Sequence, residues 1–146
     1  MNTKNKFIIL FFLLFIVSCL NFNKTNYSKL KKFINKNSFN IENYDNVMVI
    51  SEKGCVNCNK SFALLVQEKL KSNRTLFIVS AQGNTVDISL FLKSKNTILD
   101  YENKFSDLNI VENSSAIFLK HSKIDTVVNI KAKGIQTTLE YINSRM

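Results

Sequence analysis

The order of apolar segments in this 146-residue chain predicts an α/β fold, with a central mixed β-sheet flanked by helices. Two apolar runs, Val47 to Ile50 and Thr75 to Val79, enclose a stretch with helical spacing, which is the order of a β-α-β unit. Nearer the C-terminus, two strand-like segments joined by a polar turn indicate an antiparallel hairpin, and a helical pattern follows it. A sheet that holds both kinds of pairing is mixed.

The segment between the first two strands has the spacing of an amphipathic helix. Phe62, Leu65, Val66 and Leu70 recur on one face, and Cys58 lies on that face four residues before Phe62. This helix is therefore expected to cross over the sheet in the right-handed sense. The elements expected after it are short helices or turns at Ile88 to Lys95 and Tyr101 to Asn109, a buried strand at Ala116 to Leu119, a tight turn at Lys120 to Lys123, an alternating strand at Ile124 to Ile130, and a helix carrying Ile135, Leu139 and Ile142.

Composition excludes several classes of protein. Hydrophobic residues make up 45% of the chain and include 12 Phe, so the chain is too apolar to be disordered, and three Cys are too few for a disulfide-stapled miniprotein. The net charge of +9 comes mostly from the N-terminal part, because residues 43–146 hold 13 basic and 10 acidic side chains. Such a domain lacks the basic face that a nucleic acid requires.

The N-terminus has the pattern of an export signal. Two lysines precede Phe7 to Val17, an apolar run of eleven residues that is too short to span a bilayer. The run ends in Ile16-Val17-Ser18-Cys19, which resembles the lipobox of bacterial lipoproteins. That resemblance implies that residues 1–18 are a lipoprotein signal peptide and that Cys19 becomes the lipidated anchor. The alternative is an ordinary signal peptide or anchor helix that ends in a buried Cys19.

The segment after this signal is rich in Asn, Lys and Ser. We expect residues 19–42 to form a lipidated polar tether, and residues 43–146 to form the folded domain. Leu30, Phe33 and Ile34 have helical spacing, so a short helix at about residues 28–36 is expected to dock on the domain.

The sequence Gly54-Cys55-Val56-Asn57-Cys58 places a CxxC pair directly after a buried strand and at the start of a helix. The free N–H groups and the dipole of a helix N-terminus stabilise a thiolate there. Cys55 is therefore the candidate attacking thiolate and Cys58 the candidate resolving thiol. Lys53 and Lys60 flank the pair and are candidates for lowering the thiol pKa further.

With a β-α-β unit before it and a hairpin and helix after it, this CxxC pair resembles that of the thioredoxin superfamily, in particular its membrane-tethered, TlpA-like branch. The resemblance implies a thioredoxin-like fold and a thiol-disulfide oxidoreductase of the bacterial cell envelope that acts as a reductant. Its partners would be protein thiols or disulfides of envelope clients and a separate redox partner, and it would need no bound cofactor. The lipid anchor would hold it at the membrane, facing the periplasm or the exterior.

Three positions depart from the family pattern. Gly54 stands where the family usually has an aromatic residue, and Val49 stands where cytosolic thioredoxins have a buried acid. Ser114 and Ser115 occupy the place of the family's cis-proline, which faces the Cys pair and binds substrate. A serine keeps a cis bond only at a cost of about 2.5 to 4 kcal/mol, so the bond before Ser114 is expected to be trans.

Two other functions remain open for the Cys pair. One is a structural disulfide in a non-catalytic binding lipoprotein. The other is a metal or iron-sulfur site shared by two chains, because this chain adds only Cys19 and His121 as soft ligands and His121 is expected in a solvated turn. Glu52 is either a substitute for the missing proton acceptor or an exposed surface acid.

Overall fold

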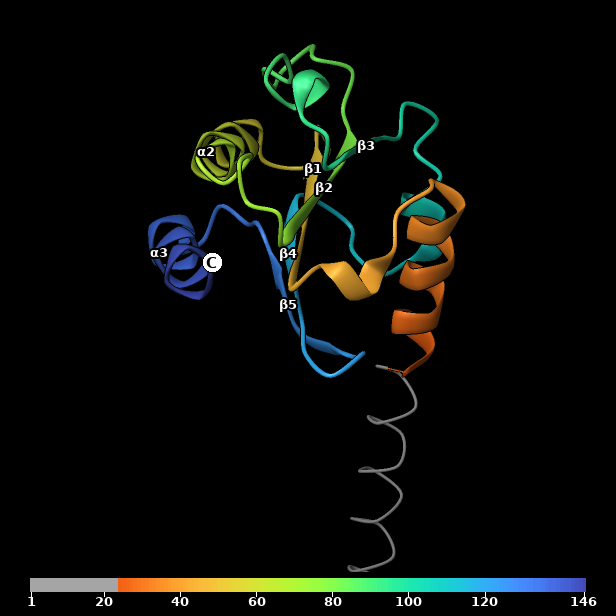
Figure 1. The fold of residues 1–146 in the computed structure, drawn as a ribbon. Helices are drawn as coiled ribbons and strands as arrows, with labels where there is room; N and C mark the ends of the chain where they lie inside the picture. Colours follow the sequence, from red (N-terminus) through yellow and green to blue (C-terminus); the bar gives the residue numbers. More distant parts are fainter. Residues whose placement is uncertain (1–23) are drawn as a thin grey trace, which may run out of the picture.

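The computed structural model describes residues 24–146, which form a five-stranded mixed sheet between helices. The expected signal peptide and Cys19 lie outside the described residues. Helices α2 and α3 cover one face of the sheet, and an N-terminal helix over residues 24–36 lies on the other (Figure 1). The other elements are the strands β1 (Asn46–Ser51), β2 (Thr75–Ser80), β3 (Thr97–Leu99), β4 (Ser115–Leu119) and β5 (Ile124–Asn129), the helices α2 (Val56–Gln67) and α3 (Ile135–Arg145), and the 3-10 turns η1 (Ile41–Asn43), η2 (Phe91–Lys93) and η3 (Ser106–Leu108).

The sheet has the strand order β3-β2-β1-β4-β5, so β1 lies at its centre. Strand β1 pairs in parallel with β2 and antiparallel with β4, and β4 pairs antiparallel with β5. These pairings confirm the predicted β-α-β unit, the hairpin and the mixed sheet. The hairpin turn closes with two hydrogen bonds between Lys120 and Lys123, and His121 lies in it, exposed. Strand β3 was not predicted: it pairs in parallel with β2 and forms one edge of the sheet.

Alternation along the strands sends side chains to two separate cores. On one face Met48 and Ile50 of β1 pack with Phe62 and Val66 of α2, and with Ile142 of α3. All five side chains are at most 1% exposed, as expected where a helix covers a sheet. This core fixes the start of α2 above the end of β1.

The second core lies under the N-terminal helix. Leu30 and Ile34 of that helix are fully buried against Val47 and Val49 of β1. The expected docking of this segment is therefore present, and it involves residues that the sequence assigned to a tether. None of the helices within residues 24–146 is long and apolar enough to cross a membrane.

A polar contact holds the same helix from the side. Lys31 Nζ lies 2.8 Å from a carboxylate oxygen of Glu42, and the hydroxyls of Tyr27 and Ser122 also donate to that carboxylate. The hydrogen bond from Lys31 and, to a smaller extent, those from the two hydroxyls lower the pKa of Glu42 to about 2. The carboxylate therefore stays ionised and links the helix to the turn between β4 and β5.

Candidate active site

The CxxC pair sits where β1 passes into α2. Cys55 is the N-cap residue of α2, and its sulfur forms a disulfide with Cys58. The backbone N–H of Cys58 donates to Cys55 Sγ at 3.3 Å. A thiolate at Cys55 would accept the same bond and would face the positive end of the helix dipole. The predicted helix-start placement of the pair is confirmed.

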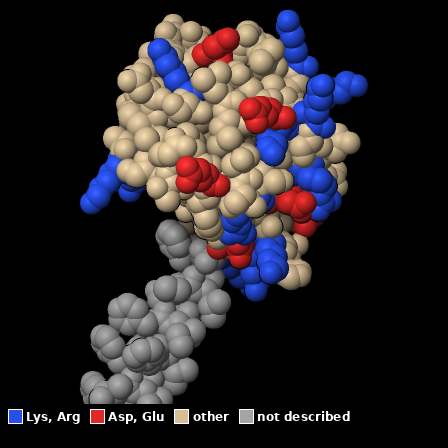
Figure 2. Space-filling model, turned by 90° about the vertical axis from the view of Figure 1, so that its left-hand side faces the viewer, with Lys and Arg blue, Asp and Glu red and all other residues tan. Residues whose placement is uncertain are grey.

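The two sulfurs differ in their access to solvent. Cys58 is 5% exposed and packs into the core under α2, whereas Cys55 is half-buried at the surface. Val56 beside it is 40% exposed and adds an apolar side chain to a surface that also carries the exposed Lys53 and Asn57. On the face that carries α2 and α3, acidic and basic side chains are interspersed on a largely uncharged surface (Figure 2). Cys55 is therefore the more accessible cysteine of the pair.

Gly54 adopts a conformation that explains the absence of an aromatic residue before the pair. Its φ is +83°, in the left-handed region that favours glycine. A Cβ placed there would lie 2.9 Å from Oδ1 of Asn113, which is too close without a shift of that side chain. Asn113 therefore occupies the space beside the pair that a larger side chain at position 54 would need.

The buried side chain of Asn59 holds the loop between β1 and α2. It is 1% exposed, and its Nδ2 donates to the carbonyl of Lys53 at 2.8 Å. Its backbone N–H donates to the carbonyl of Cys55 at 2.9 Å. Its Oδ1 is buried with no hydrogen-bond partner among the described residues. The amide thus ties the residues before Cys55 to the first turn of α2.

Ser115 begins β4 and Ser114 directly precedes it, next to the end of β1. Ser114 Oγ accepts from the N–H of Ser51 at 2.9 Å and donates to its carbonyl at 3.1 Å, so this hydroxyl extends the pairing of β1 with β4. Ser115 Oγ donates to the side chain of Asn129 at 2.8 Å. Both serines are fully buried, and every peptide bond in residues 24–146 is trans, as expected for Ser114. Their substrate-binding role stays a prediction.

The carboxylate of Glu52 is bound by backbone N–H groups, and none of its hydrogen bonds goes to either cysteine. Its carboxylate accepts the backbone N–H groups of Gln82, Thr85 and Val86 at 3.0, 2.7 and 3.4 Å. Burial alone would raise the pKa of Glu52, but these N–H bonds outweigh it and lower the pKa. Glu52 therefore clamps the loop after β2 against the loop that leads to Cys55. Lys53 and Lys60 are both exposed.

A metal site is not assembled by the part of the chain that is described. Residues 24–146 bring no three His, Cys, Asp or Glu side chains together in a group that could hold a metal ion. His121 lies in the β4–β5 turn, beside the start of β1 and thus at the end of the sheet away from Cys55. The Cys pair is the chemistry-bearing feature that the geometry supports.

The sequence located the two cysteines but not the residues that hold the loop around them, Asn59 and Asn113. Asn59 carried a signal, because it is a polar residue three positions before Phe62, on a helix face that is otherwise apolar. Asn113 carried none, since its contact with Gly54 depends on where the loop before β4 lies. Comparisons of the chain with protein-family models, with curated proteins and with solved structures found no match.

Proposed function

We propose that this protein is a thioredoxin-like thiol-disulfide oxidoreductase that exchanges disulfides with protein thiols through Cys55 and Cys58. The observation that carries the proposal is the placement of an accessible Cys55 at the N-terminus of α2, with the Cys58 N–H directed at its sulfur. A structural disulfide needs neither an accessible sulfur nor a hydrogen-bond donor that stabilises a thiolate. A nucleophile needs both.

The proposed reaction transfers two electrons from the reduced pair to a client disulfide. The Cys55 thiolate attacks one client sulfur, a mixed disulfide forms, and the other client sulfur leaves as a thiolate. Cys58 loses its proton to water and attacks Cys55 Sγ, which breaks the mixed disulfide and releases the second client thiolate. Water protonates the released thiolates, and the pair is left oxidised, as in the structure.

Return to the reduced state requires a dithiol donor, which we assign to a separate redox protein of the envelope. Resemblance to the TlpA-like branch supports action as a reductant of envelope clients. The buried Cys58 suits the role of resolving thiol, because it attacks the mixed disulfide from inside the protein. No bound cofactor enters this reaction.

Equilibration of the protein with glutathione redox buffers tests the function. The fraction of reduced pair is measured by alkylation of free thiols and mass spectrometry. We expect the pair to equilibrate within the range of thioredoxin-like proteins, roughly −270 to −120 mV. The matched control is Cys55→Ala, which cannot form the disulfide. A pair that stays oxidised below about −300 mV and does not react with dithiols would instead be a structural disulfide.

We also propose that the protein is a lipoprotein anchored at the envelope through Cys19, because the segment before that residue has the pattern of an export signal. Changing Cys19 to alanine is expected to move the protein from the membrane fraction to the soluble fraction and to abolish labelling with a fatty acid. Unchanged membrane partitioning of this variant would show that the apolar run from Phe7 to Val17 is the anchor.

A further inference from the structure

Strand β3 leaves one edge of the sheet without a partner among the described residues. The carbonyl of Asn96 and the N–H of Asp100 bond to β2. Because backbone groups alternate along a strand, those of Thr97 and Leu99 point to the open side. Thr97 also has a buried Oγ1 with no partner, and Leu99 is 39% exposed. Unpaired backbone groups of this kind can pair with an added strand.

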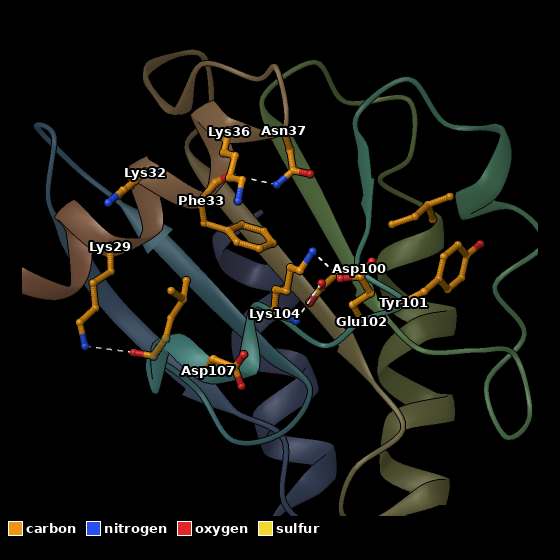
Figure 3. A pocket seen from close by; sticks show the side chains of 12 residues that line it. Lys29, Lys32, Phe33, Lys36, Asn37, Asp100, Tyr101, Glu102, Lys104 and Asp107 are labelled. Atoms are coloured by element: carbon orange, nitrogen blue, oxygen red, sulfur yellow. Dashed lines mark hydrogen bonds and ion pairs between the residues drawn. The ribbon is translucent and has the colours of Figure 1, made fainter.

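A groove of about 680 Å³ meets this edge at Leu99, the last residue of β3, and continues between the N-terminal helix and residues 100–108. Figure 3 shows Phe33, on the N-terminal helix, at one side of it and Tyr101 at the other, with Asp100 between them. Tyr101 is 47% exposed and Leu99 also lines the groove, so its walls offer apolar surface. The volume is within the usual range of ligand-binding clefts, about 300–1,000 Å³.

The helix side of the groove carries three lysines whose charge is only partly neutralised, since Lys36 helps to lower the pKa of Glu102 across the groove. Lys29, Lys32 and Lys36 all line it, and none of them forms an ion pair with a described residue. Lys29 Nζ donates to the carbonyl of Leu108 at 3.1 Å, which leaves its charge uncompensated.

Asp100 and Glu102 lie on the other side of the groove, whereas Asp107 directly precedes Leu108, to which Lys29 donates (Figure 3). Asp100 accepts hydrogen bonds from the hydroxyl of Ser80 and from two backbone N–H groups. Glu102 forms an ion pair with Lys104. The helix side therefore favours negative side chains on an occupant.

We propose that this groove binds an extended acidic segment of a client protein, which adds to β3 as a further strand. Backbone groups of the segment would pair with Thr97 and Leu99, while its acidic side chains would face Lys32 and Lys36. The client assignment rests on the proposed function, and the surface is continuous with that site. Tyr101 also lines a neighbouring hollow together with Lys53, which is two residues before Cys55.

Charge argues against a second copy of this chain as the occupant. Lys93 and Lys95 precede β3, so a β3–β3 pair would bring two sets of these lysines, together with the lysines of the two helices, to one interface. Lysines beside an edge strand disfavour such self-pairing. An acidic segment meets the same lysines as partners.

The test measures fluorescence anisotropy of a labelled hexapeptide, Glu-Val-Glu-Phe-Glu-Val, with the oxidised full-length protein, so that no disulfide exchange is needed. We expect saturable binding at low salt that weakens as salt rises. The double variant Lys32→Glu/Lys36→Glu should weaken binding about tenfold or more. The matched control Lys131→Glu/Lys133→Glu, with the same change of charge on exposed lysines before α3, should bind as wild type.

Backbone pairing is tested by N-methylation of alternate peptide residues in the two possible registers. One register should lose binding and the other should keep it, since only alternate N–H groups of an added strand face β3. Equal weakening by both lysine double variants, or no effect of N-methylation in either register, would overturn the proposal. Binding of anionic vesicles that depends on Lys32 and Lys36, without binding of the peptide, would assign the surface to a membrane instead.

Discussion

Replacing Leu30 by alanine, or Ile34 by alanine, is expected to lower the free energy of unfolding by about 2–5 kcal/mol at each site. Both side chains are fully buried in the core between the N-terminal helix and β1, and each substitution leaves a cavity there. Small domains are stable by only about 5–15 kcal/mol, so the double variant should be close to unfolded. Urea unfolding followed by circular dichroism measures the change.

Ser28→Ala is the matched control, because Ser28 is exposed on the same helix and its loss removes no core contact. We expect this variant to change stability by less than about 0.5 kcal/mol. Near-wild-type stability of both Leu30→Ala and Ile34→Ala would show that the helix does not belong to the folded domain.

This helix also shows where sequence patterns stop being informative. The spacing of Leu30, Phe33 and Ile34 predicted a short docked helix at about residues 28–36 within a polar tether, whereas the helix spans residues 24–36 and is part of the core. A helix that covers a sheet needs a single apolar stripe, and its other faces can be fully polar. Composition averaged over the whole segment therefore understated how much of it belongs to the folded domain.

The central strands were predictable because each is a continuous apolar run buried on both faces, as in Val47 to Ile50. Strand β3 was not, because it is three residues long, Thr97–Leu99, and pairs along one edge only. Its pairing depends on contact with β2 rather than on its own sequence. The same limit applies to the site: the CxxC spacing located the sulfurs, while the contact between Gly54 and Asn113 required the fold.

Changing Cys58 to serine is expected to stop the proposed reaction halfway. The accessible Cys55 would still attack a disulfide, since α2 begins at the same place and its first N–H groups remain. Without a second thiol at position 58 nothing could resolve the mixed disulfide, so the adduct should accumulate to nearly one per protein chain. Multiple turnover of a client disulfide should be lost.

Mass spectrometry of the Cys58→Ser variant, incubated with excess glutathione disulfide, tests the central claim most directly. The proposed mechanism predicts one glutathione adduct, which peptide mapping locates at Cys55. Cys55→Ser is the matched control: only the buried cysteine of the pair, Cys58, remains, and peptide mapping should show that adduct at position 58 forms at least about tenfold more slowly. Equal rates in the two variants, or no adduct at Cys55, would contradict the assignment of Cys55 as the nucleophile.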